Sequence, residues 1–199
     1  MNKKTDLKKA LKKVLTLCEC SVLLALSAAL SFVIIYPAPM GGSVTLLSML
    51  PLLMVGARHG FKWGLGTAFV YSLIQLCQAL AAGNVFVYCY TPIAVAICVL
   101  FDYLVPFTAL GFTFFAKKRD GSVGRLRFIL LCAVLIAFRF ACHYVTGVVI
   151  WGQWAPDGMG KYLYSLLYNG AYMLPELVLT VVGAAVITGS AHFVKMMKK

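Results

Sequence analysis

The chain consists of long, nearly unbroken runs of apolar residues separated by short polar connectors. A helix needs about 20 consecutive apolar residues to cross the hydrocarbon core of a bilayer. The strands of outer-membrane barrels instead alternate apolar and polar residues in short segments, so the pattern excludes that fold. It predicts six transmembrane helices, at residues 14–36, 44–57, 63–82, 92–116, 128–151 and 163–194.

The second predicted helix, 44–57, is short for a full span and contains Pro51. Proline has no amide hydrogen to donate and its ring clashes with the preceding turn of a helix. We therefore expect either a kink or a late start of the helix at this position. Pro175 lies in the same way inside the last predicted helix.

The composition supports lipid as the solvent of most of the chain. Of the 199 residues, 62% are apolar and 12% are charged, whereas ordinary globular domains are about 45–50% apolar and 25% charged. This excludes most soluble enzymes and indicates an all-α integral membrane protein. We expect a basic segment at 1–13, one membrane domain at 14–194 and a basic tail at 195–199.

The net charge of +12 would favour nucleic-acid binding in a soluble protein, but here its placement indicates orientation. Sixteen of the 18 Lys and Arg residues fall in four segments, 1–13, 58–62, 117–127 and 195–199. Lys161 is in a connector of the opposite side, and Arg139 is inside a predicted helix. Because basic residues concentrate on the cytoplasmic side of membrane proteins, we expect both termini in the cytoplasm and the connectors 37–43, 83–91 and 152–162 outside.

Four charged residues lie inside predicted helices, where each costs about 2.5–3.5 kcal/mol on insertion scales. They are Glu19, Asp102, Arg139 and Glu176. Glu19 is close to the cytoplasmic end of its helix, where lysines can meet it. Arg139 and Glu176 lie deep, and we expect them to pair with each other. The alternative is that Arg139 attracts an anionic part of a ligand, such as a phosphate.

The fifth predicted helix carries polar and aromatic residues at four-residue spacing, which places them on one face. These residues are Arg139, His143, Gly147 and Trp151. Asp102, Tyr164 and Asn169 of the neighbouring helices reach the same outer half of the bundle. Aromatic faces and one carboxylate fit a small, flat, cationic ligand in a cavity open to the outside.

Alternatives to this binding site remain open. Asp102, Arg139 and Glu176 could form an ion-pair network that only holds the bundle together. Gly147 either leaves room for a ligand ring or allows close helix packing. The small residues Ser21, Ala25 and Ala29 form a stripe that serves either packing within the chain or docking of a membrane partner.

The sequence has no signature of the common catalytic or metal sites. It contains neither a G-x-S-x-G turn nor a P-loop. The seven cysteines form no C-x-x-C pair, and we expect them to fill apolar space. We therefore predict no catalytic residue, no metal and no cofactor.

Five segments, in this order, resemble the thiamine-specific substrate-binding (S) components of energy-coupling factor (ECF) vitamin transporters. They are PMGGSVTLLSMLP at 39–51, RHGFKWGLGTA at 58–68, DYLVP at 102–106, HYVTGVVIWGQWAPDG at 143–158 and YSLLYNGAYM at 164–173. The resemblance implies a six-helix S-component bundle in the bacterial cell membrane. Its thiamine pocket would face outside under the first outer loop.

The resemblance also implies roles for individual residues. The implied substrate-binding residues are Asp102, Tyr103, Arg139, His143, Gly147, Trp151, Tyr164 and Asn169. Asp102 stands where the family usually has an acidic residue, often Glu, and some members have a tryptophan where this chain has Gly41 and Gly42. Tyr88 and Tyr90 are candidates for the aromatic contribution of the second outer connector.

The implied partners are a transmembrane coupling subunit, on which Ser21, Ala25 and Ala29 would dock, and two ABC ATPase subunits that supply the energy. Two alternatives stay open. The chain could be an S component for another flat vitamin or precursor, or an intramembrane enzyme that uses His143 and Asp102.

Overall fold

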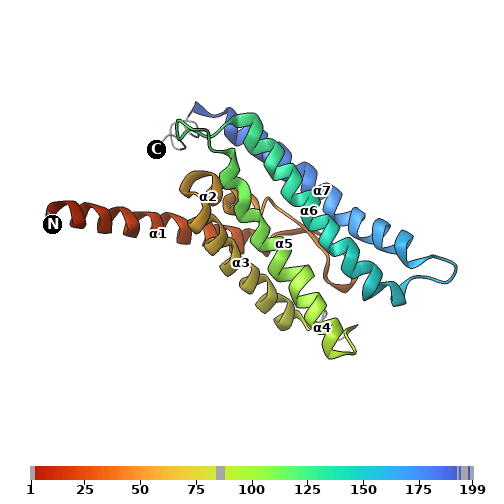
Figure 1. Cartoon of the computed structure of the whole chain (residues 1–199). Coiled ribbons are helices and arrows are strands. Elements are labelled where there is room, and N and C mark those ends of the chain that lie inside the picture. Colours follow the sequence, from red (N-terminus) through yellow and green to blue (C-terminus); the bar gives the residue numbers. More distant parts are fainter. Residues whose placement is uncertain (1–2, 84–87, 192, 194–196, 198–199) are drawn as a thin grey trace.

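The computed structural model describes residues 3–83, 88–191, 193 and 197, and it is an elongated bundle of helices (Figure 1). The α-helices are α1 (Lys3–Ser31), α2 (Leu50–His59), α3 (Phe61–Ala82), α4 (Pro92–Cys98), α5 (Val105–Ala109), α6 (Arg125–Val149) and α7 (Lys161–Gly189). Shorter helical turns are η1 (Pro39–Gly41), η3 (Val99–Leu104), η4 (Leu110–Ala116) and η5 (Trp151–Trp154). The prediction of an all-α membrane bundle is confirmed.

Five helical segments of the described chain are long and apolar enough to cross a membrane. They are Lys3–Ser31, Phe61–Ala82, Pro92–Ala116, Arg125–Val149 and Lys161–Gly189. The remaining one of the six predicted helices is α2. It has ten residues, which gives a length of about 15 Å, half the thickness of a hydrocarbon core. It starts at Leu50 rather than at residue 44. Pro51 lies in its first turn, where a missing amide hydrogen costs nothing.

The first predicted helix, 14–36, has different limits in the structure. α1 begins at Lys3, so the basic N-terminal segment is helical from that residue and projects from the bundle (Figure 1). Lys, Leu and Ala favour helix strongly enough to continue it beyond the apolar run. α1 ends at Ser31, before the β-branched residues Val33, Ile34 and Ile35, which fit extended backbone better.

The connection between α1 and α2 is a compact segment, residues 32–49, which we call the strap. Its strands β1 (Ile34–Pro37) and β2 (Ser43–Thr45) pair antiparallel, with Ile34 opposite Thr45 and Pro37 opposite Ser43. The uncharged connector predicted at 37–43 is therefore the tip of a hairpin that begins inside the first predicted helix.

The segment 92–116 is one continuous helical span with a widened turn in its middle. In η3, a π-helical turn, the Val105 amide donates to the Leu100 carbonyl five residues earlier. Pro106 follows and has no amide hydrogen for a regular bond. Such π-turns occur often at functional sites, and this one carries Asp102.

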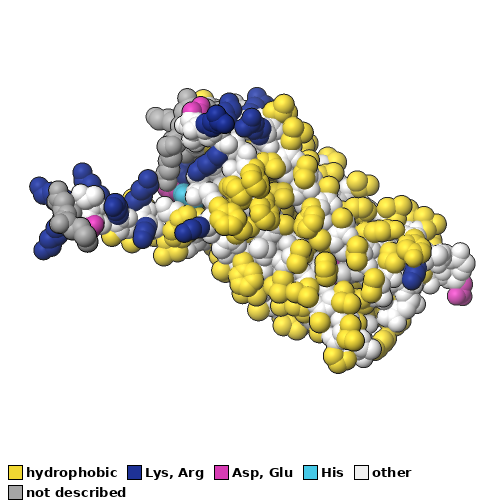
Figure 2. All heavy atoms as spheres, viewed as in Figure 1, with side chains coloured by type: hydrophobic (Ala, Val, Ile, Leu, Met, Phe, Trp, Pro, Cys, Tyr) yellow, Lys and Arg dark blue, Asp and Glu magenta, His cyan; other side chains and the backbone are white. Residues whose placement is uncertain are grey.

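Charged groups tie α1 to α2 at one end of the bundle. Arg58 donates to both carboxylate oxygens of Glu19 at 2.9 Å, and His59 Nε2 lies 3.0 Å from Glu19 Oε2. Glu19 therefore meets basic side chains at the end of α2. Lys and Arg side chains gather at the end of the molecule where α1 begins (Figure 2).

Candidate functional site

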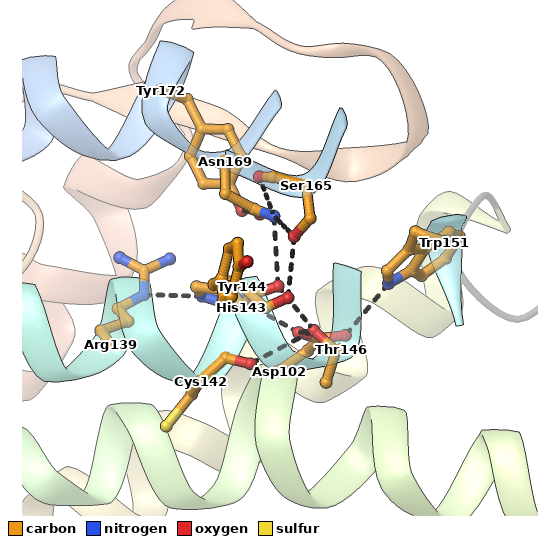
Figure 3. Close-up of polar contacts among 10 residues, drawn as sticks. All are labelled: Asp102, Arg139, Cys142, His143, Tyr144, Thr146, Trp151, Ser165, Asn169 and Tyr172. Carbon is orange, nitrogen blue, oxygen red and sulfur yellow. Dashed lines mark hydrogen bonds and ion pairs between the residues drawn. The ribbon is translucent and has the colours of Figure 1, made fainter. Parts of the chain in front are cut away.

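Asp102 lies at the centre of a hydrogen-bonded group between the helices (Figure 3). The π-helical turn of η3 places its side chain against α6, where it is buried. Oδ1 accepts from His143 Nδ1 at 2.9 Å and from Thr146 Oγ1 at 2.5 Å. Among the described residues, the hydrogen bond to Oδ2 comes from Trp151 Nε1 and is long, at 3.4 Å. Oδ2 is therefore the carboxylate oxygen with capacity left for a ligand.

The contact with Arg139 fixes the tautomer of His143. Arg139 Nε lies 3.2 Å from His143 Nε2, and a guanidinium only donates. Nε2 therefore accepts, the ring proton is on Nδ1, and Nδ1 donates to Asp102. A neutral imidazole thus separates the positive charge of Arg139 from the negative charge of Asp102. The guanidinium carbon also lies 4.3 Å from the centre of the Phe107 ring.

Asn169 of α7 closes the group from the opposite side. Its Nδ2 donates to the His143 carbonyl at 3.1 Å and to the Ser165 carbonyl at 3.0 Å. Tyr172 donates from its hydroxyl to Asn169 Oδ1 at 2.7 Å. These partners settle the orientation of the amide and tie the backbone around His143 to α7.

Gly147 lies at a close contact between α6 and α7. A Cβ atom on Gly147 would clash with Ser165 Oγ and lie 2.8 Å from Asn169 Nδ2. Ser165 in turn donates to the Tyr144 carbonyl at 2.7 Å. Of the two interpretations of this glycine, the contacts support close helix packing, because the space beside it holds protein atoms.

These side chains surround a cavity of about 100 Å³, which we call the site cavity. Six of the eight predicted substrate-binding residues line it: Asp102, Tyr103, Arg139, His143, Trp151 and Asn169. Gly147 lies behind this layer. Tyr164 stacks on Tyr168, with ring centres 5.8 Å apart, and its hydroxyl lies 3.8 Å from Met40 Sδ of the strap.

Several residues that line the site cavity were not predicted from the sequence. Tyr168 and Tyr172 line the site cavity together with Thr146, Gln75, Phe107 and residues 40–43 of the strap. Tyr164, Tyr168 and Tyr172 recur at four-residue spacing, a signal that could have identified an aromatic face of α7. In the second outer connector, the Tyr88 ring packs edge-on against Trp151 and Trp154, and Tyr90 contacts Trp154.

The expected pair between Arg139 and Glu176 is wrong. Within the described ranges, the carboxylates that have a basic group within 4.0 Å are Glu19 and Asp102. Glu176 instead accepts from the amide and the hydroxyl of Thr45, each at 2.6 Å. The alternative of an ion-pair network among Asp102, Arg139 and Glu176 fails for the same reason.

Comparisons with known proteins agree on one family. Residues 17–195 match the model of the family described as thiamine transporter protein (Thia_YuaJ). The thiamine transporter ThiT of Bacillus subtilis (strain 168) is 32% identical over 178 residues, covering 84% of this chain and 87% of that protein. The thiamine transporter ThiT of Lacticaseibacillus paracasei is 26% identical over 187 residues, covering 88% of each.

A solved structure shares the fold. It is described as native-SAD phasing for ThiT from Listeria monocytogenes, and it matches with a TM-score of 0.70 at 21% sequence identity. The match covers 94% of this chain and 98% of that chain.

Proposed function

The chain belongs to the thiamine transporter protein family, and from this premise we propose that it is the thiamine-binding S component of an ECF-type importer. The observation that carries the proposal is the Asp102 carboxylate. It is buried among aromatic side chains, and in the described part of the chain its Oδ2 has one long hydrogen bond, from Trp151. The similar proteins are named as transporters, which argues against the alternative of an intramembrane enzyme.

Thiamine joins a flat aminopyrimidine to a permanently cationic thiazolium ring. In our proposal Asp102 compensates the positive charge, and the faces of Trp151 and the α7 tyrosines attract the cation. His143 and Asn169 supply directional polar contacts that select this vitamin over other flat rings. The substrate-binding role that we propose extends to Tyr103, Arg139, Gly147 and Tyr164, the last two by supporting the layer that lines the site cavity.

Thiamine should quench the fluorescence of Trp151 in the purified chain at micromolar concentration, without ATP. The Asn169→Ala variant should bind about 10- to 100-fold more weakly, because it loses the amide that fixes the His143 backbone. The chain has three tryptophans. A background with Trp63→Phe and Trp154→Phe leaves only Trp151 to report; Trp154 must be removed because it packs on the same tyrosine as Trp151.

Absence of quenching and of heat release in the parent chain would contradict thiamine binding. Competition by riboflavin, pyridoxine and the bare aminopyrimidine separates thiamine from other flat ligands. Recovery of chemically unchanged ligand after binding separates transport from catalysis.

We also propose that α1 docks on a transmembrane coupling subunit driven by two ABC ATPase subunits. Ser21, Ala25 and Ala29 are exposed on α1. Its buried residues Thr16, Cys20 and Ser27 lie on the opposite face, so packing within the chain does not use the stripe. The basic residues gathered at one end support a cytoplasmic position of both termini (Figure 2).

Ala25→Trp should abolish co-purification with the coupling subunit and thiamine uptake in cells, while the isolated chain still binds thiamine. Leu26→Trp is the matched control, because Leu26 is also exposed but lies about 100° further around the helix. Equal loss of uptake in both variants would argue against docking through this stripe.

A further inference from the structure

We propose that Glu176 is a positioning residue that holds the strap closed over the site cavity, so that ligand exchange requires the contact between Glu176 and Thr45 to break. The inference rests on the proposed binding function and adds to it a residue that does not touch the ligand. It concerns the rates of binding and release more than the affinity.

The environment of Glu176 shows that its contact with the strap is specific. The side chain is 1% exposed, in the middle of α7. Its Oε1 accepts from the amide and the hydroxyl of Thr45, and the Thr45 hydroxyl also contacts Ser48 Oγ at 2.6 Å. Its Oε2 has no hydrogen-bond partner within the described part of the chain. Burying an acidic side chain in a spanning helix costs free energy. The element that Glu176 stabilises through its hydrogen bonds is the strap.

The strap contacts α7 at three levels of a single helix face. Gly42 packs on the Tyr172 ring so closely that a Cβ atom would lie 2.6 Å from Cε1. Thr45 bonds to Glu176, and Leu47 packs on Gly183, where a Cβ atom would lie 2.7 Å from Leu47 Cδ2. Positions 172, 176 and 183 share one face because they are four and seven residues apart. The Glu176 contact is the polar one of the three and lies between the other two.

The backbone of the strap is held in a disfavoured conformation. Met40 has a φ of 60° and Leu47 a φ of 56°, and these are the non-glycine residues with positive φ among those described. Residues with a Cβ atom persist there only when surrounding contacts hold them. Both lie in the strap, on either side of Thr45. Breaking the central contact therefore favours opening.

Opening of the strap also changes the space available to a ligand. A second cavity of about 290 Å³ lies beside the site cavity and is lined by Glu176 and Thr45. Gly41 and Ser43 of the strap line both cavities, as does Arg139. The site cavity, at about 100 Å³, is below the roughly 300–1,000 Å³ of usual ligand pockets. A two-ring ligand is admitted when the strap moves, and Glu176 opposes that movement.

Stopped-flow measurement of Trp151 fluorescence with thiamine tests the inference. The contact between Glu176 and Thr45 involves no ligand atom. Its loss should therefore favour opening of the strap both before and after the ligand binds. In Thr45→Val, which keeps the shape and removes the hydroxyl, we expect association and dissociation rate constants to rise together by about tenfold. The dissociation constant should change less than about threefold. Glu176→Gln should show the same pattern.

Thr188→Val is the matched control, because Thr188 is a buried threonine of α7 whose hydroxyl bonds within its own helix. It should leave both rate constants unchanged. A rise in dissociation without a rise in association would overturn the inference, because it would indicate direct contact of Glu176 with the cation. Unchanged rate constants in Thr45→Val and Glu176→Gln would overturn it as well.

Hydrogen exchange of the unliganded protein keeps the inference separate from the proposed function. Glu176→Gln should accelerate exchange of amides in the strap and leave those of α6 unchanged, whereas general destabilisation would accelerate both. If the parent chain fails to bind thiamine, the proposed function falls. Unchanged exchange in the strap overturns the inference alone.

Discussion

Asp102→Asn should weaken thiamine binding at least about a hundredfold. The substitution removes the negative charge that we propose to compensate the cationic ring, and it keeps the side-chain volume. Three donors converge on Asp102, from His143, Thr146 and Trp151, and an asparagine offers them one oxygen and a competing amino group. Loss of one charged hydrogen bond costs about 1.5–3 kcal/mol, and about 2.7 kcal/mol corresponds to a hundredfold change in the dissociation constant.

Asp120→Asn is the matched control for removing one carboxylate. Asp120 lies in the exposed connector before α6, where Ser122 donates to Oδ1 from its amide and its hydroxyl. These bonds hold the pKa of the Asp120 carboxyl below its ordinary value, so the control also removes a full charge at neutral pH. Isothermal titration calorimetry with thiamine measures the dissociation constant of both variants. A dissociation constant within threefold of the parent in Asp102→Asn would contradict the assigned role.

The helical part of the site followed from the sequence because helical periodicity is local. Four-residue spacing places Arg139 and His143 on one face of α6, and the structure joins them directly. The sequence places Asp102 in the same half of the bundle as His143, and in the structure the two side chains are hydrogen-bonded. Spacing and rise per residue fix such positions without knowledge of the neighbouring helices.

The structure of the strap could not be predicted from the sequence, because the strap contacts residues that are far away along the chain. Thr45 and Glu176 are 131 residues apart, and no periodicity relates them. Residue counts predict that Arg139 and Glu176 both lie deep in the bundle. They do not show that Thr45 of the strap binds the Glu176 carboxylate, and the predicted pair is therefore wrong. The run at 44–57 read as one helix because apolar content does not separate a buried strand and turn from the helix that follows.

Gly64→Ala should lower the melting temperature of the purified chain by about 5–10 °C. Gly64 of α3 meets Gly56 of α2 and Gly111 of η4, and at each of the three a Cβ atom would strike backbone. On Gly64 it would lie 2.7 Å from the Gly111 carbonyl oxygen and from Gly56 Cα. Backbone atoms have no alternative rotamer that would relieve the clash, so α2, α3 and η4 must move apart. Such overpacking costs about 1–3 kcal/mol, and each kcal/mol shifts the midpoint by about 2–4 °C at this size.

Gly66→Ala, two residues along the same helix, separates this contact from helix propensity. A Cβ atom on Gly66 meets nothing within 4 Å, and alanine is favoured over glycine in a helix by about 1 kcal/mol. The melting temperature should therefore stay the same or rise. Thermal unfolding of both variants in one detergent makes the comparison. Equal midpoints would show that α2, α3 and η4 are not in backbone contact, because both substitutions add the same methyl group to α3.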